Sequence, residues 1–201
     1  MTRLDHLVFG AADLTAGCAW MTEHIGAAPV GAGKHPAMST HNALWRIGDS
    51  YLEVIAIDPD APHPGRPRWY GLDDPGTQAQ LATEPMLLTW VVEHVAPEAL
   101  PEPTGPALPF TRDALSWTLT VPEDGLPPCA GHQPAIISWG AGTLSPGLTL
   151  PDQRLGLVKL GLAENTALRK GLGDPDWIEW RTQGPMSATL RRADGSLVIL
   201  T

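Results

Sequence analysis

The sequence predicts an α+β fold in which two strand-helix-strand-strand-strand (βαβββ) units are separated by a β-rich segment. Three observations support this class. Short apolar runs recur along the chain, a capped amphipathic helix follows the first run, and the same order of elements returns near the C-terminus. An internal duplication would explain the repeat. We expect one domain over residues 1–201, with units at 1–58 and 153–201 and a proline-rich, β-rich connection at 59–152.

The first unit has the clearest signals. A strand at 4–9 precedes Asp13, a good helix N-cap, and the helix is expected to stop at Gly26. A short strand at 28–32, a loop around His35 and a hairpin follow. The hairpin strands are 40–47 and 51–57, and the helix is supported by apolar residues at helical spacing: Leu14, Cys18, Met21 and Ile25.

The rest of the chain predicts further strands. The connection contains apolar runs at 86–92, 115–121 and 135–139 between proline-rich stretches. The second unit begins with a strand at 155–162 and a helix at 166–172. Its three remaining strands are expected at 177–181, 187–192 and 196–200, with a hairpin turn at Asp194-Gly195.

Composition excludes several functions. Hydrophobic residues make up 43% of the 201 residues and charged residues 17%, which is typical of a folded domain. The formal net charge of -9 argues against nucleic acid or an anionic membrane as the main partner, so we expect a small molecule. The two cysteines form no metal or disulfide motif, and no signal-peptide pattern or long apolar run occurs. We therefore expect a cytoplasmic protein.

Two polar residues lie inside apolar strands. His6 and Glu53 would be costly to bury without a partner, and a metal ion is one such partner. The alternative is a structural role, in which the two residues form a buried hydrogen-bonded pair or Glu53 pairs with Arg46 on the neighbouring strand.

The segments LDHLVFGAADL, GKHPAMSTHNALWRIG and YLEVIAIDPD together resemble the glyoxalase-like members of the vicinal oxygen chelate (glyoxalase, bleomycin resistance and dioxygenase) superfamily. The resemblance implies paired βαβββ modules that curl into a curved, half-open mixed sheet around a cleft. It also implies a divalent metal such as Zn, Mn, Fe or Ni, held by the first and last strands of each module. A homodimer is compatible with it, because paired modules often assemble across chains.

Carried over to this sequence, the resemblance makes His6 and Glu53 metal ligands, with Glu53 also a catalytic proton carrier. The unit at 153–201 offers no matching ligands, so His41 is the best candidate for a third. A three-residue hairpin turn would place His41 on the face of Glu53, whereas a two-residue turn would place Asn42 there. The sequence leaves both turns open.

Several further residues are expected to contact the ligand. His35 lies beside the expected cleft, and four tryptophans in strands could form an apolar wall. The substrate-binding candidates are His35, Asn42, Trp45, Trp90 and Trp139.

Two functions remain open at this point. One is a metal-dependent lyase, isomerase or dioxygenase, and the other is a metal-free protein that binds or sequesters a small molecule or drug. The sequence does not select a substrate among them.

Overall fold

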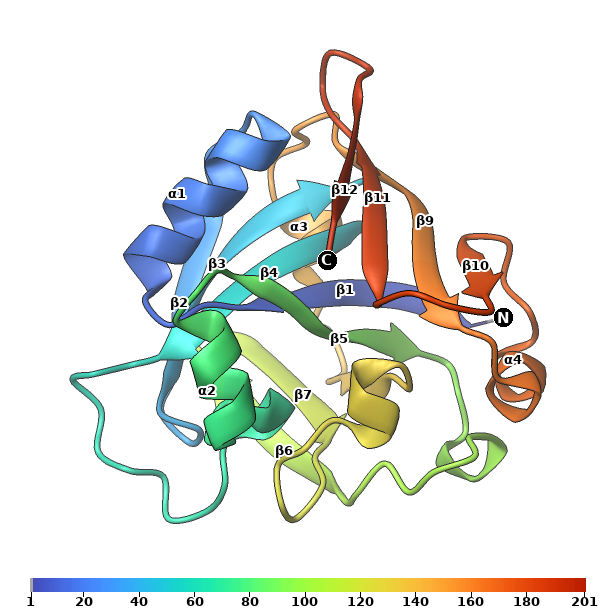
Figure 1. The fold of residues 1–201 in the computed structure, drawn as a ribbon. Helices are drawn as coiled ribbons and strands as arrows, with labels where there is room; N and C mark the ends of the chain where they lie inside the picture. Colours follow the sequence, from blue (N-terminus) through green and yellow to red (C-terminus); the bar gives the residue numbers. More distant parts are fainter. Residues whose placement is uncertain (1) are drawn as a thin grey trace.

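The computed structural model describes residues 2–201 and contains two β-sheets (Figure 1). The larger sheet has eight strands in the order β2-β3-β4-β1-β5-β8-β7-β6, and the smaller has four in the order β10-β9-β11-β12. The larger sheet mixes parallel and antiparallel pairs and curves around a pocket. The α+β class with paired modules and a curved mixed sheet is confirmed.

The first half of the large sheet forms as the sequence predicts. Strand β1 pairs in parallel with β4, and helix α1 connects β1 to β2. The Asp13 side chain accepts a hydrogen bond from the Ala16 N–H, and Gly26 ends the helix in the left-handed conformation. The elements are β1 (Arg3–Gly10), α1 (Leu14–Ile25), β2 (Gly31–His35), β3 (Thr40–Ile47) and β4 (Ser50–Ile57).

The second half mirrors the first across the antiparallel β1–β5 pair. Strand β5 pairs in parallel with β8, as β1 does with β4. The crossover from β5 to β6 contains only the short 3-10 helix η2 (Pro97–Ala99). The elements are β5 (Met86–Glu93), β6 (Ala107–Arg112), β7 (Leu115–Thr120) and β8 (Ala135–Trp139).

The expected division of the chain into units needs correction at this point. The second half of the paired sheet is supplied by residues 86–139, within the segment expected to be a connection, and not by 153–201. The physical reason is the proline-rich crossover between β5 and β6. Proline interrupts helical hydrogen bonding, so this module carries no α-helix there and lacks the strand-helix signal of the first.

The C-terminal segment forms the four-stranded sheet. Its strand β9 lies between β10 and β11, an order that differs from that of the first half. The elements are β9 (Gly156–Ala163), α4 (Thr166–Leu172), β10 (Ile178–Arg181), β11 (Ser187–Arg191) and β12 (Leu197–Leu200). The remaining short elements are η1 (Trp69–Gly71), α2 (Pro75–Leu81), η3 (Pro128–Gly131) and α3 (Pro146–Thr149).

The two faces of the large sheet have different neighbours. Its outer face packs against α1 and the C-terminal sheet through one continuous apolar cluster. Its inner face carries a second cluster, which borders the pocket. Because side chains alternate along a strand, each strand contributes to both faces.

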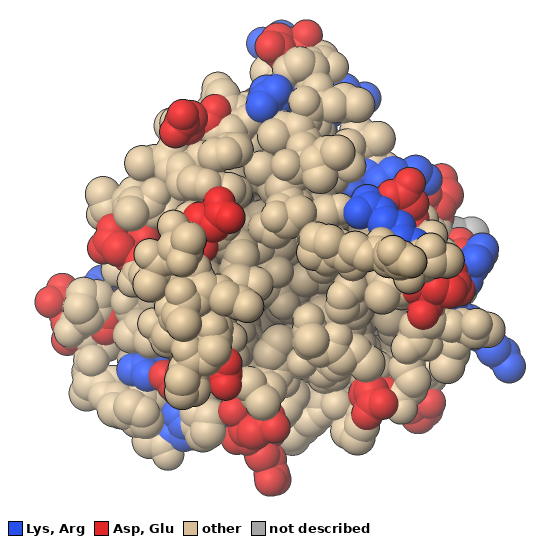
Figure 2. Space-filling view, viewed as in Figure 1, with Lys and Arg blue, Asp and Glu red and all other residues tan. Residues whose placement is uncertain are grey.

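The surface in Figure 2 carries acidic and basic side chains mixed around its margin, with an uncharged, hollowed centre. No helix within residues 2–201 has the length and apolar character needed to span a bilayer.

Candidate functional site

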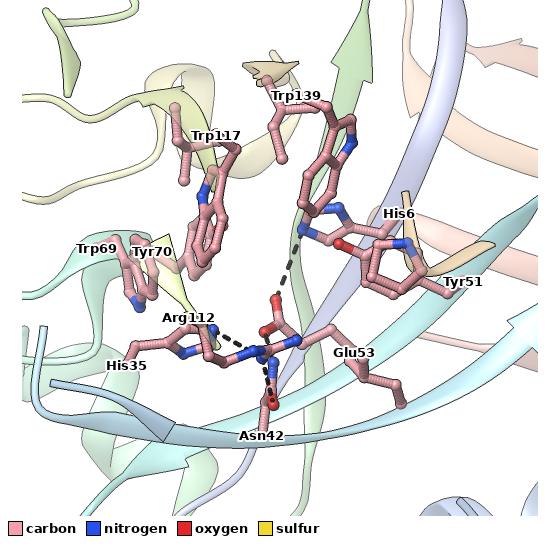
Figure 3. Close-up of a pocket in the computed structure, with 14 residues that line it drawn as sticks. His6, His35, Asn42, Tyr51, Glu53, Trp69, Tyr70, Arg112, Trp117 and Trp139 are labelled. Carbon is pink, nitrogen blue, oxygen red and sulfur yellow. Dashed lines mark hydrogen bonds and ion pairs between the residues drawn. The ribbon is translucent and has the colours of Figure 1, made fainter. Parts of the chain in front are cut away.

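A narrow pocket opens on the inner face of the large sheet, where the two halves meet (Figure 3). Its cavity volume is about 30 Å³. The lining residues come from both halves of the sheet and from the segments covering it: His6, His35, Asn42, Leu44, Tyr51, Glu53, Trp69, Tyr70, Arg112, Trp117, Leu119, Ile137, Trp139 and Pro146.

His6 is oriented by its neighbour Asp5. A β-bulge in β1 between Leu4 and His6 brings these adjacent side chains together, with Asp5 Oδ1 2.6 Å from His6 Nδ1. Burial raises the pKa of Asp5. Hydrogen bonds from His6, Trp139 and Ser145, together with the charge of His6, outweigh this effect, so the net shift of the pKa is downward. The ionised carboxylate accepts the Nδ1 proton, which leaves Nε2 for the pocket.

Glu53 lies beside this free nitrogen. Its Oε2 is 3.6 Å from His6 Nε2, and both side chains are buried. The Asn42 amide donates a hydrogen bond of 2.5 Å to Glu53 Oε1, and the Tyr51 ring stacks on the imidazole of His6 with centroids 4.5 Å apart. The pocket therefore holds an imidazole nitrogen and a carboxylate oxygen in fixed positions close to each other.

A second polar group lies around His35. The Arg112 guanidinium Nη1 is 3.2 Å from His35 Nε2 and 3.2 Å from Asn42 Oδ1. Burial, together with the charges of Arg112 and His6, lowers the pKa of His35 to about 3. His35 is therefore neutral at physiological pH, and its Nε2 is available to accept from Arg112.

Aromatic side chains form the remaining wall. Trp117 and Trp139 contact each other with centroids 5.6 Å apart, and Trp69 stacks on Tyr70 at 5.3 Å. Tyr70 adopts the left-handed backbone conformation with φ of 60°, which is unusual for an aromatic residue and places strain beside the pocket. Burial raises the pKa values of Tyr70 and Tyr51 well above their usual range, so both hydroxyls stay protonated.

Some of the predicted site residues line the pocket, and the others lie outside it. The pocket brings together His6, Glu53, Asn42, His35 and Trp139. His35 lies in β2, whereas the sequence predicts a loop there. Arg46 does not pair with Glu53, because its side chain donates to the carbonyls of Gly48 and Leu150.

His41 does not join the pocket. The β3–β4 turn has two residues, Gly48 and Asp49, so Leu44 pairs with Glu53 and His41 pairs with Ala56. Alternation then directs His41 to the opposite face of the sheet. The structure thus corrects the expectation that His41 is the third metal ligand.

Trp45 and Trp90 also lie away from the pocket. Both are completely buried in the apolar cluster of the outer face. Trp45 Nε1 donates to the Ala27 carbonyl at 2.7 Å, and Trp90 Nε1 donates to the His132 carbonyl at 3.1 Å. Their expected role in ligand binding is therefore corrected to one in core packing.

Two functional residues escape sequence reasoning. Asp5 precedes His6 directly, and neighbours in a regular strand point to opposite faces, so only the bulge reveals their contact. Arg112 lies 59 positions beyond Glu53 in the chain and reaches the site because the two sheet edges approach each other. An acidic residue beside a strand histidine is the one signal available for Asp5.

The residues present do not make a complete divalent-metal site. His6 and Glu53 supply two donors, and no group of three His, Cys, Asp or Glu side chains within residues 2–201 could hold a metal. In the second half, β5 and β8 present Val91, Ala135 and Ile137 to the inner apolar cluster. These side chains cannot coordinate a metal.

Comparisons with known proteins found a matching family model and similar solved structures. A family model described as a glyoxalase-like domain matches residues 4–171. A crystal structure of a hypothetical protein from Staphylococcus aureus aligns with a TM-score of 0.58 and 14% identity, covering 99% of this chain and 85% of that one. The methylmalonyl-CoA epimerase from Mycobacterium tuberculosis aligns with a TM-score of 0.40 and 16% identity, covering 68% and 85%. No curated protein matches at the sequence level.

Proposed function

Because this chain belongs to the glyoxalase-like domain family, within the vicinal oxygen chelate superfamily, we propose that its pocket binds a small carbonyl compound and moves a proton on it. One observation carries the proposal. His6 Nε2 and Glu53 Oε2 lie 3.6 Å apart in a buried pocket, and the carboxylate of Asp5 fixes the orientation of His6.

The proposed chemistry is an isomerisation. Glu53 takes a proton from the carbon next to the carbonyl group. The electron pair of the broken C–H bond forms the C=C bond of an enolate, and the π pair of the C=O bond moves onto the oxygen. The protonated Glu53 then returns this proton to carbon, or passes it to His6 Nε2, which delivers it to carbon or oxygen, so that the atoms and charges balance. Burial of both groups excludes bulk water from the reacting atoms.

Proton exchange with solvent tests this function. In D₂O, NMR should record loss of C–H signals from pyruvate, pyruvamide or hydroxyacetone above the uncatalysed rate. Glu53→Gln keeps the side-chain shape and should lower the rate about 100-fold or more. The matched control is Glu179→Gln, an exposed carboxylate on β10, which should leave the rate unchanged. No exchange with any carbonyl compound, or full exchange in Glu53→Gln, would contradict the proposal.

The family resemblance implies that a divalent metal is required. Because His6 and Glu53 supply only two donors, we propose that the chemistry does not depend on a metal. Metal analysis of protein purified without chelator, compared with a His6→Ala, Glu53→Gln double variant, decides the matter. Equal and negligible metal in both supports metal-independent chemistry. Stoichiometric metal in the wild type that disappears in the double variant would overturn it.

Ligand binding without chemistry is a second candidate function. The aromatic wall of Trp69, Trp117 and Trp139 favours it, because such walls bind flat or apolar ligands. Quenching of tryptophan fluorescence by a compound that undergoes no proton exchange would select this function over isomerisation.

A further inference from the structure

Arg112 connects the two open edges of the eight-stranded sheet. It ends β6, one edge strand, and its side chain lies over Gly33 of β2, the other edge strand. A Cβ atom at position 33 would lie 2.5 Å from Arg112 Nη1 and 2.7 Å from Cζ. The absence of a side chain at Gly33 therefore lets the guanidinium reach the pocket (Figure 3).

The charge of Arg112 has no direct counter-ion. Within residues 2–201, no carboxylate forms an ion pair with it, and its protein partners are the neutral groups His35 and Asn42. Arg112 is linked to the Glu53 carboxylate only through the side-chain amide of Asn42. The other carboxylate of the site, Asp5, forms its hydrogen bonds with His6, Trp139 and Ser145. Guanidinium carries five donors, and both protein contacts use Nη1.

Other donors line the same pocket. The hydroxyls of Tyr51 and Tyr70 line it and make no hydrogen bond to a protein group in the described part of the chain. Hydroxyl groups that lack a protein acceptor favour a ligand that carries hydrogen-bond acceptors.

The size of the cavity narrows the ligand further. A cavity volume of about 30 Å³ favours a small ligand over a bulky one. The planar guanidinium fork matches a carboxylate in a bidentate arrangement.

We propose that Arg112 forms a carboxylate-binding subsite and that the ligand of this pocket is a small organic acid. The inference deepens the proposed function, because the carboxylate held by Arg112 would set the position of the neighbouring carbon relative to Glu53 and His6. Binding itself requires no proton transfer, so the two proposals can fail separately.

Matched acid and amide ligands test the subsite. Pyruvate and pyruvamide, and likewise lactate and lactamide, have similar shapes but differ in charge. Tryptophan fluorescence and isothermal titration should give the wild type at least a 10-fold preference for the acids, the scale expected of charge-assisted hydrogen bonds. Equal affinity for acid and amide, or no binding of either acid, would overturn the proposal.

Variants of Arg112 in β6 and Gly33 in β2 test whether this site causes the preference for acids. Arg112→Met should weaken acid binding about 10-fold or more and remove the preference over amides, whereas Arg112→Lys should retain part of it because the charge remains. Gly33→Ala should weaken acid binding in the same direction by displacing an unaltered guanidinium. Arg191→Met, an exposed arginine of β11, is the control. Circular dichroism and thermal unfolding establish that each variant is folded.

The outcomes separate the subsite from the proposed function. Acids that bind through Arg112 but undergo no deuterium exchange would support the subsite and contradict the isomerisation. Exchange on hydroxyacetone and pyruvamide at the rate of pyruvate would support the isomerisation and overturn the subsite. An acid preference that persists in Arg112→Met would also overturn it.

Discussion

The two halves of the eight-stranded sheet share one strand order but contribute different chemistry to the pocket. The first half, β1–β4, supplies the polar residues His6, Asn42, Tyr51 and Glu53. The second half, β5–β8, supplies an apolar wall that includes Trp117 and Trp139, and its one charged contribution is Arg112. A symmetric backbone thus holds an asymmetric site, with most of the polar side chains on one wall and an apolar wall with one arginine on the other.

The halves also differ in what covers their outer face. Helix α1 connects β1 to β2 and packs on β3 and β4. The second half has a proline-rich crossover with η2 in the equivalent place, and α4 of the C-terminal segment packs against η2. Apolar residues of the C-terminal sheet join the same outer cluster as β5 and β8. The C-terminal segment therefore covers the area that a second crossover helix would cover.

The largest effect is expected where a tryptophan of the first half lies in the outer core. Trp45 is completely buried, and Trp45→Ala should lower the free energy of unfolding by about 4 kcal/mol because it removes a large packed side chain. Ligand affinity should change little in the folded fraction. Urea unfolding measures the loss of stability.

Trp139 of the second half provides the contrast. It lines the pocket and donates to Asp5 at 2.9 Å, so Trp139→Ala should reduce ligand binding and proton exchange more than Trp45→Ala does. If Trp45→Ala impaired binding more strongly than Trp139→Ala at equal folded fraction, the assignment of the two faces would be wrong.

A smaller loss of stability is expected at low pH, where His35 becomes protonated in the unfolded chain. The folded-state pKa of His35 is about 3, against 6.5 for the unperturbed group, so the unfolded chain binds the proton more readily. The stabilisation is fully present above pH 6.5 and is lost as the pH falls from 6.5 towards 3. Two pH units below 6.5, the free energy of unfolding should be lower by about 2 to 3 kcal/mol than above pH 6.5.

Unfolding by urea at a series of pH values measures this linkage. His35→Phe cannot titrate and should show a flatter dependence between pH 6.5 and 4.5 than the wild type, whatever its absolute stability. Carboxylates with lowered pKa values, such as Asp58, lose their stabilisation at lower pH and remain in both proteins. Parallel pH profiles for the two proteins would show that His35 is not held neutral.

The contrast between the halves also explains what the sequence could predict. Local signals located the first half closely, because Asp13, the helical spacing that follows it and Gly26 act within one element. His6 and Glu53 were recognisable because polar residues interrupt apolar strands. The second half lacked a helix signal, and its strand β6 was not predicted. The strands β5, β7 and β8 were predicted individually but could not be assigned to a module.

The remaining site residues depended on features that spacing does not encode. The side of the sheet on which His41 lies is set by one residue in the length of the Gly48–Asp49 turn. The contact of Asp5 with His6 requires a bulge, and Arg112 enters the pocket only because β6 and β2 approach each other across the curved sheet. Such contacts are decided by tertiary structure.

The packing of α4 on the second half predicts a further effect of about 2 kcal/mol. A Cβ atom at position 171 would overlap the carbonyl oxygen of Ala99 in η2, so Gly171→Ala forces the two elements apart. The overpacking cost should exceed the gain of about 1 kcal/mol from replacing a helical glycine. Differential scanning calorimetry should show a lower Tm, and a raised Tm would contradict the covering role of the C-terminal segment.

The smallest loss of stability is expected for substitutions at the glycines that end the two helices. Gly26 ends α1 and Gly173 ends α4, with φ of 74° and 75° and no atom within 4 Å of an added Cβ. Gly26→Ala and Gly173→Ala should therefore each cost about 1 kcal/mol through backbone strain alone, and asparagine should cost less at both positions. Urea unfolding followed by tryptophan fluorescence should give one transition with equal shifts. A shift for Gly26→Ala without one for Gly173→Ala would mean that the C-terminal segment unfolds separately from the sheet that it covers.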